Sequence, residues 1–240
     1  MPTTDPTGSQ ATIIFDLDHT LVRGDSFAAF NRELLLDAWW RIGLAMLAVP
    51  AIAALWSFSA TRTRAGSILL WLGTVARSGD LRTRMDEFVI RHFSDGSRIC
   101  SRAVEQARLH CQRGDRVIVV TGAAELLARR VCVQIGLDSV EIVGSTLRDW
   151  MGGWVAGEHC TGERKVKMLA DRKVMEPWDC AYTDSASDLP LLTRARRRIL
   201  ANPQTRARRL LSTHSATALR SSHGGRTASM TSSWTVTKAA

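Results

Sequence analysis

Two aspartates follow a short apolar segment near the N-terminus. Residues 12–15 read Thr-Ile-Ile-Phe, and Asp16 and Asp18 come directly after them. A short apolar run of this kind is typical of a strand buried in a parallel sheet. Side chains two residues apart in an extended chain share a face, so both carboxylates would point into one crevice at the carboxyl end of the strand. Two carboxylates that close repel each other, which predicts a divalent cation beside them.

Three further stretches carry polar residues suited to the same site: Val120-Thr-Gly122, Gly162-Glu-Arg-Lys165 and Tyr182-Thr-Asp-Ser-Ala-Ser-Asp188. Thr121 and Gly122 end a second apolar strand, and the hydroxyl of Thr121 and the backbone N–H of Gly122 can donate hydrogen bonds to a phosphoryl oxygen. Lys165 would supply a fixed positive charge. Asp184 follows a third apolar strand, and together with Asp188 it adds oxygen ligands of the kind that suit Mg²⁺.

In order and spacing, these four stretches resemble the four motifs of the haloacid dehalogenase superfamily of phosphatases. The resemblance covers residues 12–210 and implies that Asp16 is a nucleophile that forms an aspartyl-phosphate, with Asp18 as general acid and then base. It implies catalytic roles for Thr121 and Lys165 and phosphate binding by Gly122. It also implies that Mg²⁺ is held by Asp16, Asp18, Asp184 and Asp188, with Asp18 contributing its backbone carbonyl.

Asp25 has two readings. In phosphoserine phosphatases, an acidic residue near this position contacts the substrate amine, so the resemblance makes Asp25 a substrate-binding candidate. Asp25 is equally well placed to cap a helix that begins near Phe27, because aspartate is a favoured residue at the N-cap.

The segments between these motifs alternate between strands and helices, which predicts an α/β fold with a parallel sheet. The resemblance makes this a Rossmann-like core with an all-helical cap inserted after the first strand. We therefore expect the core in residues 12–24 and 114–211 and the cap in residues 25–113. The polar residues 1–11 and the Ser-, Thr- and Arg-rich residues 212–240 are expected to be a disordered lead and tail.

The composition limits the choice of partners. The chain has 240 residues and a formal net charge of +9, which suits an anionic partner such as a phosphate ester or an acidic membrane surface. The arginines between residues 194 and 209 are typical of a solvated face, so we expect no nucleic-acid binding. Five cysteines without a C-x-x-C pair argue against a disulfide framework and structural zinc. The sequence carries no signal for an oligomeric state.

An apolar segment lies inside the expected cap. No charged residue occurs from Ile42 to Thr61, a length that would cross a bilayer once. However, the catalytic motifs precede and follow this segment, so the chain has to return, and the next apolar run, Ser67–Ala76, is too short to span. With Pro50 interrupting the first run, we expect a kinked helical hairpin that dips into one leaflet. The alternative is an ordinary buried cap helix.

This segment and several motifs are similar to the phosphatidylglycerophosphatase C family of bacterial phosphatases. The similar motifs are Ser67-Ile-Leu-Leu-Trp-Leu-Gly73, Gly152-Gly-Trp154, Cys160-Thr-Gly-Glu-Arg-Lys165 and Asp184-Ser-Ala-Ser-Asp-Leu-Pro-Leu-Leu192. The resemblance implies hydrolysis of phosphatidylglycerol phosphate at the cytoplasmic face of the inner membrane, with anionic phospholipid as partner. One alternative is a cytoplasmic phosphatase of a small soluble phosphomonoester, similar to phosphoserine phosphatase. Another is an inactive membrane-associated interaction protein, against which the intact acidic motifs argue.

Overall fold

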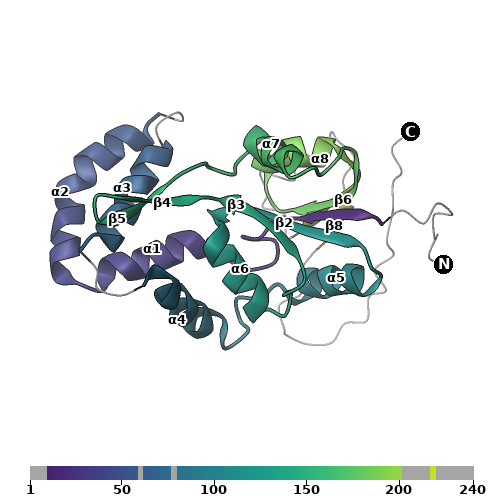
Figure 1. The fold of residues 1–240 in the computed structure, drawn as a ribbon, viewed down its shortest axis with the longest axis horizontal. Helices are drawn as coiled ribbons and strands as arrows, with labels where there is room; N and C mark the ends of the chain where they lie inside the picture. Colours follow the sequence, from purple (N-terminus) through teal and green to yellow (C-terminus); the bar gives the residue numbers. More distant parts are fainter. Residues whose placement is uncertain (1–9, 59–61, 77–79, 202–216, 220–240) are drawn as a thin grey trace.

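A parallel sheet forms the centre of the molecule. The computed structural model describes residues 10–58, 62–76, 80–201 and 217–219. Six strands pair in the order β3-β2-β1-β6-β7-β8, and every pairing is parallel (Figure 1). Their bounds are β1 Thr12–Phe15, β2 Arg116–Ala124, β3 Glu141–Ser145, β6 Trp178–Thr183, β7 Ala195–Ala201 and β8 Thr217–Leu219. The predicted α/β class with a parallel sheet is confirmed.

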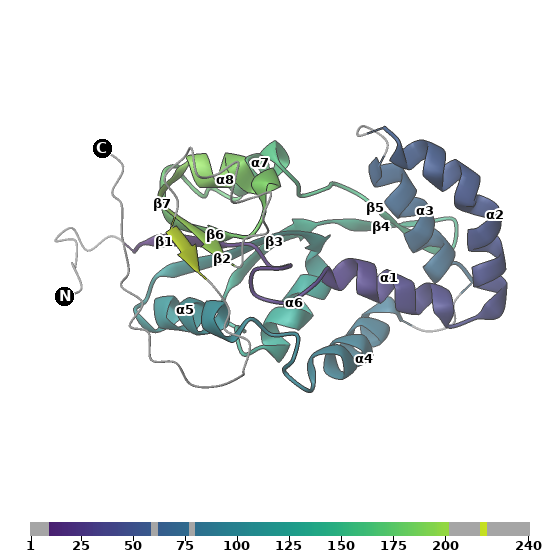
Figure 2. The same cartoon turned by 180° about the vertical axis from the view of Figure 1, so that it is seen from behind.

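Strand β1 is buried on both faces because its alternate residues belong to two apolar clusters. Phe15 packs with β2 and β6 residues such as Val119 and Tyr182, on the face covered by α5 (Ser101–Gln112) and α6 (Glu125–Gln134). Ile14 packs in the opposite cluster, on the face covered by α7 (Glu163–Asp171) and α8 (Leu189–Thr193). The result is a three-layer α/β/α core, in which helices cover both faces of the sheet (Figures 1 and 2).

Four more helices lie between β1 and α5: α1 Ser26–Leu36, α2 Trp39–Trp56, α3 Arg62–Thr74 and α4 Leu81–Phe93. Helices α1, α2 and α3 gather beyond the sheet together with a hairpin formed by β4 (Leu147–Trp150) and β5 (Gly153–Ala156) (Figure 1). We propose that these elements form the cap. Its limits differ from the expected range of 25–113, because α5 buries Ala103, Val104 and Ala107 in the core beside the sheet. The hairpin, which was assigned to the core range, packs against α3.

The C-terminal segment contains a correction to the sequence prediction. Residues Thr217–Leu219 lie in the expected disordered tail, yet they form β8, which pairs with Ile199–Ala201 of β7. A strand at this place covers the edge of β7, whose backbone groups would otherwise have no partner on that side. Residues 1–9 and the rest of the expected tail lie outside the described residues.

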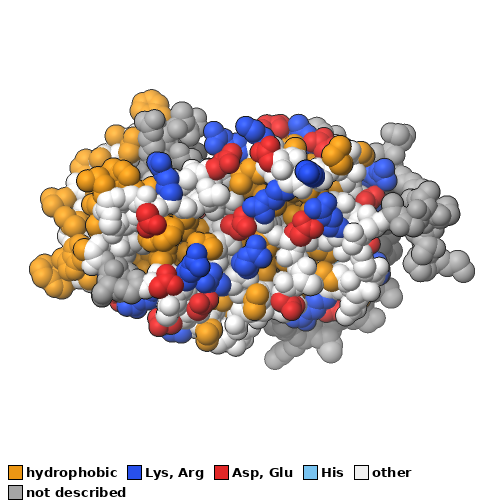
Figure 3. All heavy atoms as spheres, in the orientation of Figure 1, with side chains coloured by type: hydrophobic (Ala, Val, Ile, Leu, Met, Phe, Trp, Pro, Cys, Tyr) orange, Lys and Arg blue, Asp and Glu red, His pale blue; other side chains and the backbone are white. Residues whose placement is uncertain are grey.

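Helix α2 is apolar around its whole circumference. Several of its large apolar side chains are exposed to solvent, including Trp39 at 84% exposure and Leu47 at 80%. Figure 3 shows hydrophobic side chains gathered at the end of the molecule where α2 lies. Within the described residues, no single helix is long and apolar enough to cross a membrane; α1 and α2 together reach that length and composition, but they are bent by 115° at their junction. Pro50, which was expected to interrupt the apolar segment, lies inside α2.

The β4–β5 hairpin is fixed to α3 by side chains of the helix. Trp71 Nε1 donates to the carbonyl oxygen of Trp150 (3.1 Å), and the backbone N–H of Trp154 donates to Thr74 Oγ1 (2.8 Å). Gly153 permits this close approach, because a Cβ at that position would lie 2.7 Å from Trp71 Cδ1 and 3.2 Å from the backbone nitrogen of Val75. These contacts hold the hairpin against α3.

We expect Gly153→Ala to lower the free energy of unfolding by about 1–3 kcal/mol, since the added methyl group has to displace an indole ring or backbone. Gly43→Ala is the matched control, because no atom lies within 4 Å of its added Cβ and the site is helical. That variant should gain up to about 1 kcal/mol from helix propensity. Urea unfolding followed by circular dichroism measures both changes; equal stability of the two variants would contradict the close contact.

Candidate active site

One cavity brings together all eight residues singled out from the sequence. It has a volume of about 1060 Å³ and lies at the carboxyl ends of the central strands, beneath the cap helices. Its lining includes Asp16, Asp18, Asp25, Thr121, Gly122, Lys165, Asp184 and Asp188. The carboxyl ends of β1, β2 and β6 meet here because the three strands are adjacent and parallel.

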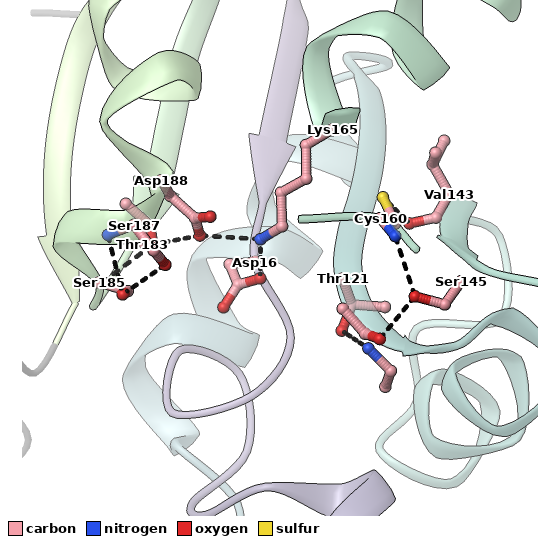
Figure 4. Close-up of polar contacts among 12 residues, drawn as sticks. Asp16, Thr121, Val143, Ser145, Cys160, Lys165, Thr183, Ser185, Ser187 and Asp188 are labelled. Carbon is pink, nitrogen blue, oxygen red and sulfur yellow. Dashed lines mark hydrogen bonds and ion pairs between the residues drawn. The ribbon is translucent and has the colours of Figure 1, made fainter. Parts of the chain in front are cut away.

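A buried lysine connects two of the acidic motifs. Lys165 lies in the first turn of α7, and its Nζ donates to Asp16 Oδ1 (2.7 Å) and Asp188 Oδ2 (2.8 Å) (Figure 4). Asp188 Oδ2 also accepts a hydrogen bond from Thr183 Oγ1 (2.9 Å). Burial alone would lower the pKa of Lys165, but the charges of Asp16 and Asp188 outweigh it, so its pKa is raised and the ammonium group is retained.

Asp16 occupies an environment that disfavours a lone negative charge. Burial raises the pKa of its carboxyl group, Lys165 opposes that effect, and the nearby charges of Asp188 and Asp18 add to the rise. The net direction is upward. A cation at this place would favour the ionised form that nucleophilic attack requires.

Asp18 lies next to the start of α1. Its Oδ1 accepts a hydrogen bond from the backbone N–H of Ser26 (2.9 Å). Burial raises the pKa of Asp18 to about 6, against the lowering effect of the Ser26 hydrogen bond. A carboxyl group that titrates near neutral pH can both give and take a proton, which is the property of a general acid and base.

The raised pKa of Asp18 predicts a pH-dependent stability. A carboxyl group whose pKa is higher in the folded state stabilises the protein fully below its unfolded value, and this stabilisation is lost as pH rises through the folded value. The difference between 3.8 and about 6 corresponds to roughly 3 kcal/mol. We expect the metal-free wild type to lose this much stability, relative to the non-titrating Asp18→Asn variant, between pH 4 and pH 7. Parallel urea titrations of both proteins measure the difference; curves that stay parallel across this range would contradict the burial of Asp18.

The last residues of β2 are held by Ser145, a side chain that the motifs in the sequence do not include. Ser145 Oγ donates to the carbonyl oxygen of Gly122 (2.7 Å) and accepts from the backbone N–H of Cys160 (3.0 Å) (Figure 4). Thr121 Oγ1 accepts from the backbone N–H of Ala123 (3.0 Å). Ser145 thus connects the end of β3 with β2 and with the segment before α7. Ser145 is the last residue of β3, and Thr121 lies near the end of β2. A polar residue at the end of an apolar strand is therefore the sequence signal that could have identified Ser145.

The acidic residues offer oxygen ligands of the type that Mg²⁺ prefers. Asp184 follows β6, is buried and lines the cavity with Asp16, and burial raises the pKa of its carboxyl group. Among the described residues, no three His, Cys, Asp or Glu side chains are arranged as a ready-made metal cluster. Mg²⁺ commonly takes one or two carboxylates and fills its other positions with water and substrate phosphate. Asp16 and Asp184 fit that pattern, whereas Asp188 Oδ2 is engaged by Lys165 and Thr183.

Asp25 serves as the N-cap of α1 and also lines the cavity. Its Oδ1 accepts a hydrogen bond from the backbone N–H of Ala28 (2.8 Å), and its side chain is exposed. The capping role expected from the sequence is therefore present, and the cavity position keeps substrate contact open as a proposal.

The rest of the cavity was not identified from the sequence. Residues of α1, α2 and α3 make its cap-side wall, and most of them are apolar: Phe27, Leu35, Leu36, Ile42, Ala45, Met46, Val49, Ile52, Leu69 and Leu70. Asn31 and Arg32 of α1 and His159 of the segment before α7 add polar groups. The spacing of Ala28, Arg32 and Leu36 is the helical i, i+4 pattern that places residues on one face.

Comparisons with known proteins agree with this fold. The sequence profile of the haloacid dehalogenase-like hydrolases matches residues 13–193. A relative from Mycobacterium tuberculosis (strain ATCC 25618 / H37Rv), named phosphoserine phosphatase SerB1, is 27% identical over 218 residues, which cover 85% of this chain and 69% of the relative. A solved protein of unknown function from Bordetella pertussis Tohama I has a TM-score of 0.70 at 22% identity, covering 88% of this chain and 99% of that one. A phosphoserine phosphatase in apo form has a TM-score of 0.54 at 16% identity, covering 84% and 90%.

Proposed function

The chain belongs to the family of haloacid dehalogenase-like hydrolases, and from that premise we propose that it is a Mg²⁺-dependent phosphatase that hydrolyses a phosphomonoester through an aspartyl-phosphate on Asp16. The observation that carries this proposal is the contact of Lys165 with both Asp16 and Asp188 in a cavity that Asp18 and Asp184 also line. Three of the four motifs supply these residues, and Thr121 and Gly122 of the remaining motif line the same cavity.

The residues have distinct tasks in this reaction. Asp16 attacks phosphorus, and the leaving oxygen takes a proton from Asp18; the ionised Asp18 then removes a proton from the water that hydrolyses the aspartyl-phosphate. Lys165 holds the attacking carboxylate in place and offsets negative charge on the phosphoryl group. Thr121 and Gly122, within the last four residues of β2, line the cavity and would donate to phosphoryl oxygens.

Asp16, the backbone carbonyl of Asp18 and Asp184 would hold Mg²⁺, with Asp188 acting through Lys165 or through water. When bound, Mg²⁺ neutralises charge on the phosphate and allows a dianion to approach several carboxylates.

A phosphate-release assay tests the proposed activity. We expect Mg²⁺-dependent release of phosphate from at least one of three substrates: phosphoserine, a sugar phosphate, and phosphatidylglycerol phosphate in detergent micelles. EDTA should abolish the release, and added Mg²⁺ should restore it. Absence of release from all three, with the protein folded and Mg²⁺ in excess, would overturn the proposal.

A small soluble phosphomonoester is the first candidate substrate. The name of the Mycobacterium tuberculosis relative supports it, because that protein is called a phosphoserine phosphatase and shares 27% identity with this chain. The position of Asp25 on the cavity wall adds support, since a carboxylate there would suit a substrate amine. In this case the protein would work in the cytoplasm.

A phospholipid, phosphatidylglycerol phosphate, is the second candidate. The apolar cap-side lining of the cavity favours it, because α1, α2 and α3 offer aliphatic contacts that a small charged ester would not use. The exposed apolar side chains of α2 would then rest on an anionic membrane surface at the cytoplasmic face of the inner membrane. The motifs similar to phosphatidylglycerophosphatase C support the same candidate. Sedimentation of the wild-type protein with vesicles containing phosphatidylglycerol tests the lipid candidate. If the protein does not bind these vesicles at low salt, the soluble phosphomonoester remains as the candidate substrate.

A further inference from the structure

Helix α1 leads from the catalytic acid to the apolar part of the cavity. Its first backbone N–H, that of Ser26, contacts Asp18, and its later turns contribute in order Phe27 and Ala28, Asn31 and Arg32, then Leu35 and Leu36 to the cavity lining. At 1.5 Å per residue, the pair at 31 and 32 lies about 8–9 Å along the axis from Ser26, and the leucine pair about 14–15 Å. A polar turn thus stands between two apolar turns.

Arg32 is an unusual feature of this wall. Among the described residues that line the cavity, Lys165 and Arg32 are the lysines and arginines. Lys165 is buried between two carboxylates, whereas the described part of the chain contains no ion pair to Arg32, whose side chain is exposed to the cavity. A guanidinium group in such a position is suited to a carboxylate or a phosphate oxygen.

Two other residues of the cavity lining have hydrogen-bonding capacity that the described residues do not use. Asn31 Oδ1 and His159 Nδ1 are both buried atoms without a hydrogen-bond partner. Burial and the charge of Arg164 lower the pKa of His159, so its ring is neutral near pH 7. Buried polar atoms normally have partners, and a ligand in the cavity would supply them.

We propose that Arg32, with Asn31 beside it, binds a second anionic group on the leaving group of the substrate. The substrate class is a phosphomonoester whose alcohol carries a carboxylate or a phosphodiester a few bonds beyond the ester oxygen. The hydroxyl or amine groups of such an alcohol would meet Asn31 and His159. The inference rests on the proposed phosphatase function, which it narrows to doubly anionic esters, and it makes Arg32 a specificity-determining residue.

Substrate pairs test the proposal. Phosphoserine is paired with phosphoethanolamine, which lacks the carboxylate, and phosphatidylglycerol phosphate is paired with dodecyl phosphate, which lacks the phosphodiester. For Arg32→Gln, we expect KM for the doubly anionic member of one pair to rise about tenfold more than KM for the singly anionic member. A tenfold difference corresponds to about 1.4 kcal/mol of binding free energy. Arg32→Lys should recover part of this difference, because it restores the charge without the planar fork.

Arg82→Gln is the matched control, since Arg82 is an exposed residue of α4 and does not line the cavity. A selective effect within the lipid pair assigns the anion to a headgroup, and a selective effect within the serine pair assigns it to a carboxylate. If Arg32→Gln changes both members of each pair equally while the wild type remains active, the anion subsite is overturned. If the wild type releases no phosphate from any ester, the proposed function itself fails.

Discussion

Asp16→Asn is expected to reduce phosphate release by at least about 10⁴-fold, because an amide cannot form the acyl-phosphate intermediate and removal of a nucleophile costs factors of this order. The substitution keeps the shape of a side chain that is 9% exposed and whose Oδ1 lies 2.7 Å from Lys165 Nζ. The variant should still fold, because Lys165 keeps its contact with Asp188, and the loss of activity should appear in kcat.

Single-turnover and steady-state phosphate release with excess Mg²⁺ measure the effect of this change. Asp138→Asn is a suitable control, because it makes the same chemical change at an exposed position outside the cavity. Circular dichroism should show both variants folded. Turnover of Asp16→Asn near that of the control would exclude Asp16 as the nucleophile.

Lys165→Met should lower kcat by about 10²–10³-fold and should also destabilise the protein. The catalytic loss reflects the removal of one preorganised positive group from the reacting phosphate. The loss of stability arises because Asp16 and Asp188 would remain buried without the ammonium that contacts both of them. Breaking a buried ion pair by removing one partner costs about 3–5 kcal/mol, so a clear decrease in melting temperature is expected.

Lys167→Met provides the matched comparison for Lys165→Met. Lys167 lies two residues further along α7, where its side chain is exposed and does not line the cavity. Its variant should keep both kcat and melting temperature close to those of the wild type. A larger loss of kcat in Lys167→Met than in Lys165→Met would show that Lys167, and not Lys165, acts on the reacting phosphate.

The catalytic end of the cavity was predictable because its residues follow buried strands. Asp16, Thr121 and Asp184 each come at the end of an apolar segment, and parallel strands bring such ends to one edge. The pairing of Lys165 with Asp188 was not predictable in the same way. Lys165 and Asp188 belong to different elements of the fold, and the motifs in the sequence predict Asp188 as a metal ligand, not as a partner of Lys165.

The cap was harder to predict, since its apolar helix carries no periodic signal. Helix α2 has apolar residues on every side, so the sequence does not distinguish Met46, which lines the cavity, from Leu47, which does not. The limits of the cap could not be predicted either, because α5 has the same amphipathic pattern as a cap helix. Only the packing of α5 against the sheet shows that it belongs to the core.

The strand order has a consequence for synthesis of the protein. Strand β1 leaves the ribosome first, yet it lies in the middle of the sheet, and its partners are Arg116–Val119 on one side and Cys180–Tyr182 on the other. At about 5–20 residues per second, the nascent chain carries an apolar strand with an open edge for roughly 10–30 s. During that interval, β1 is exposed to chaperones and to other nascent chains. A chain cut short before β6 would lack Asp184 and would keep that edge open permanently, which favours aggregation over a partly active fragment.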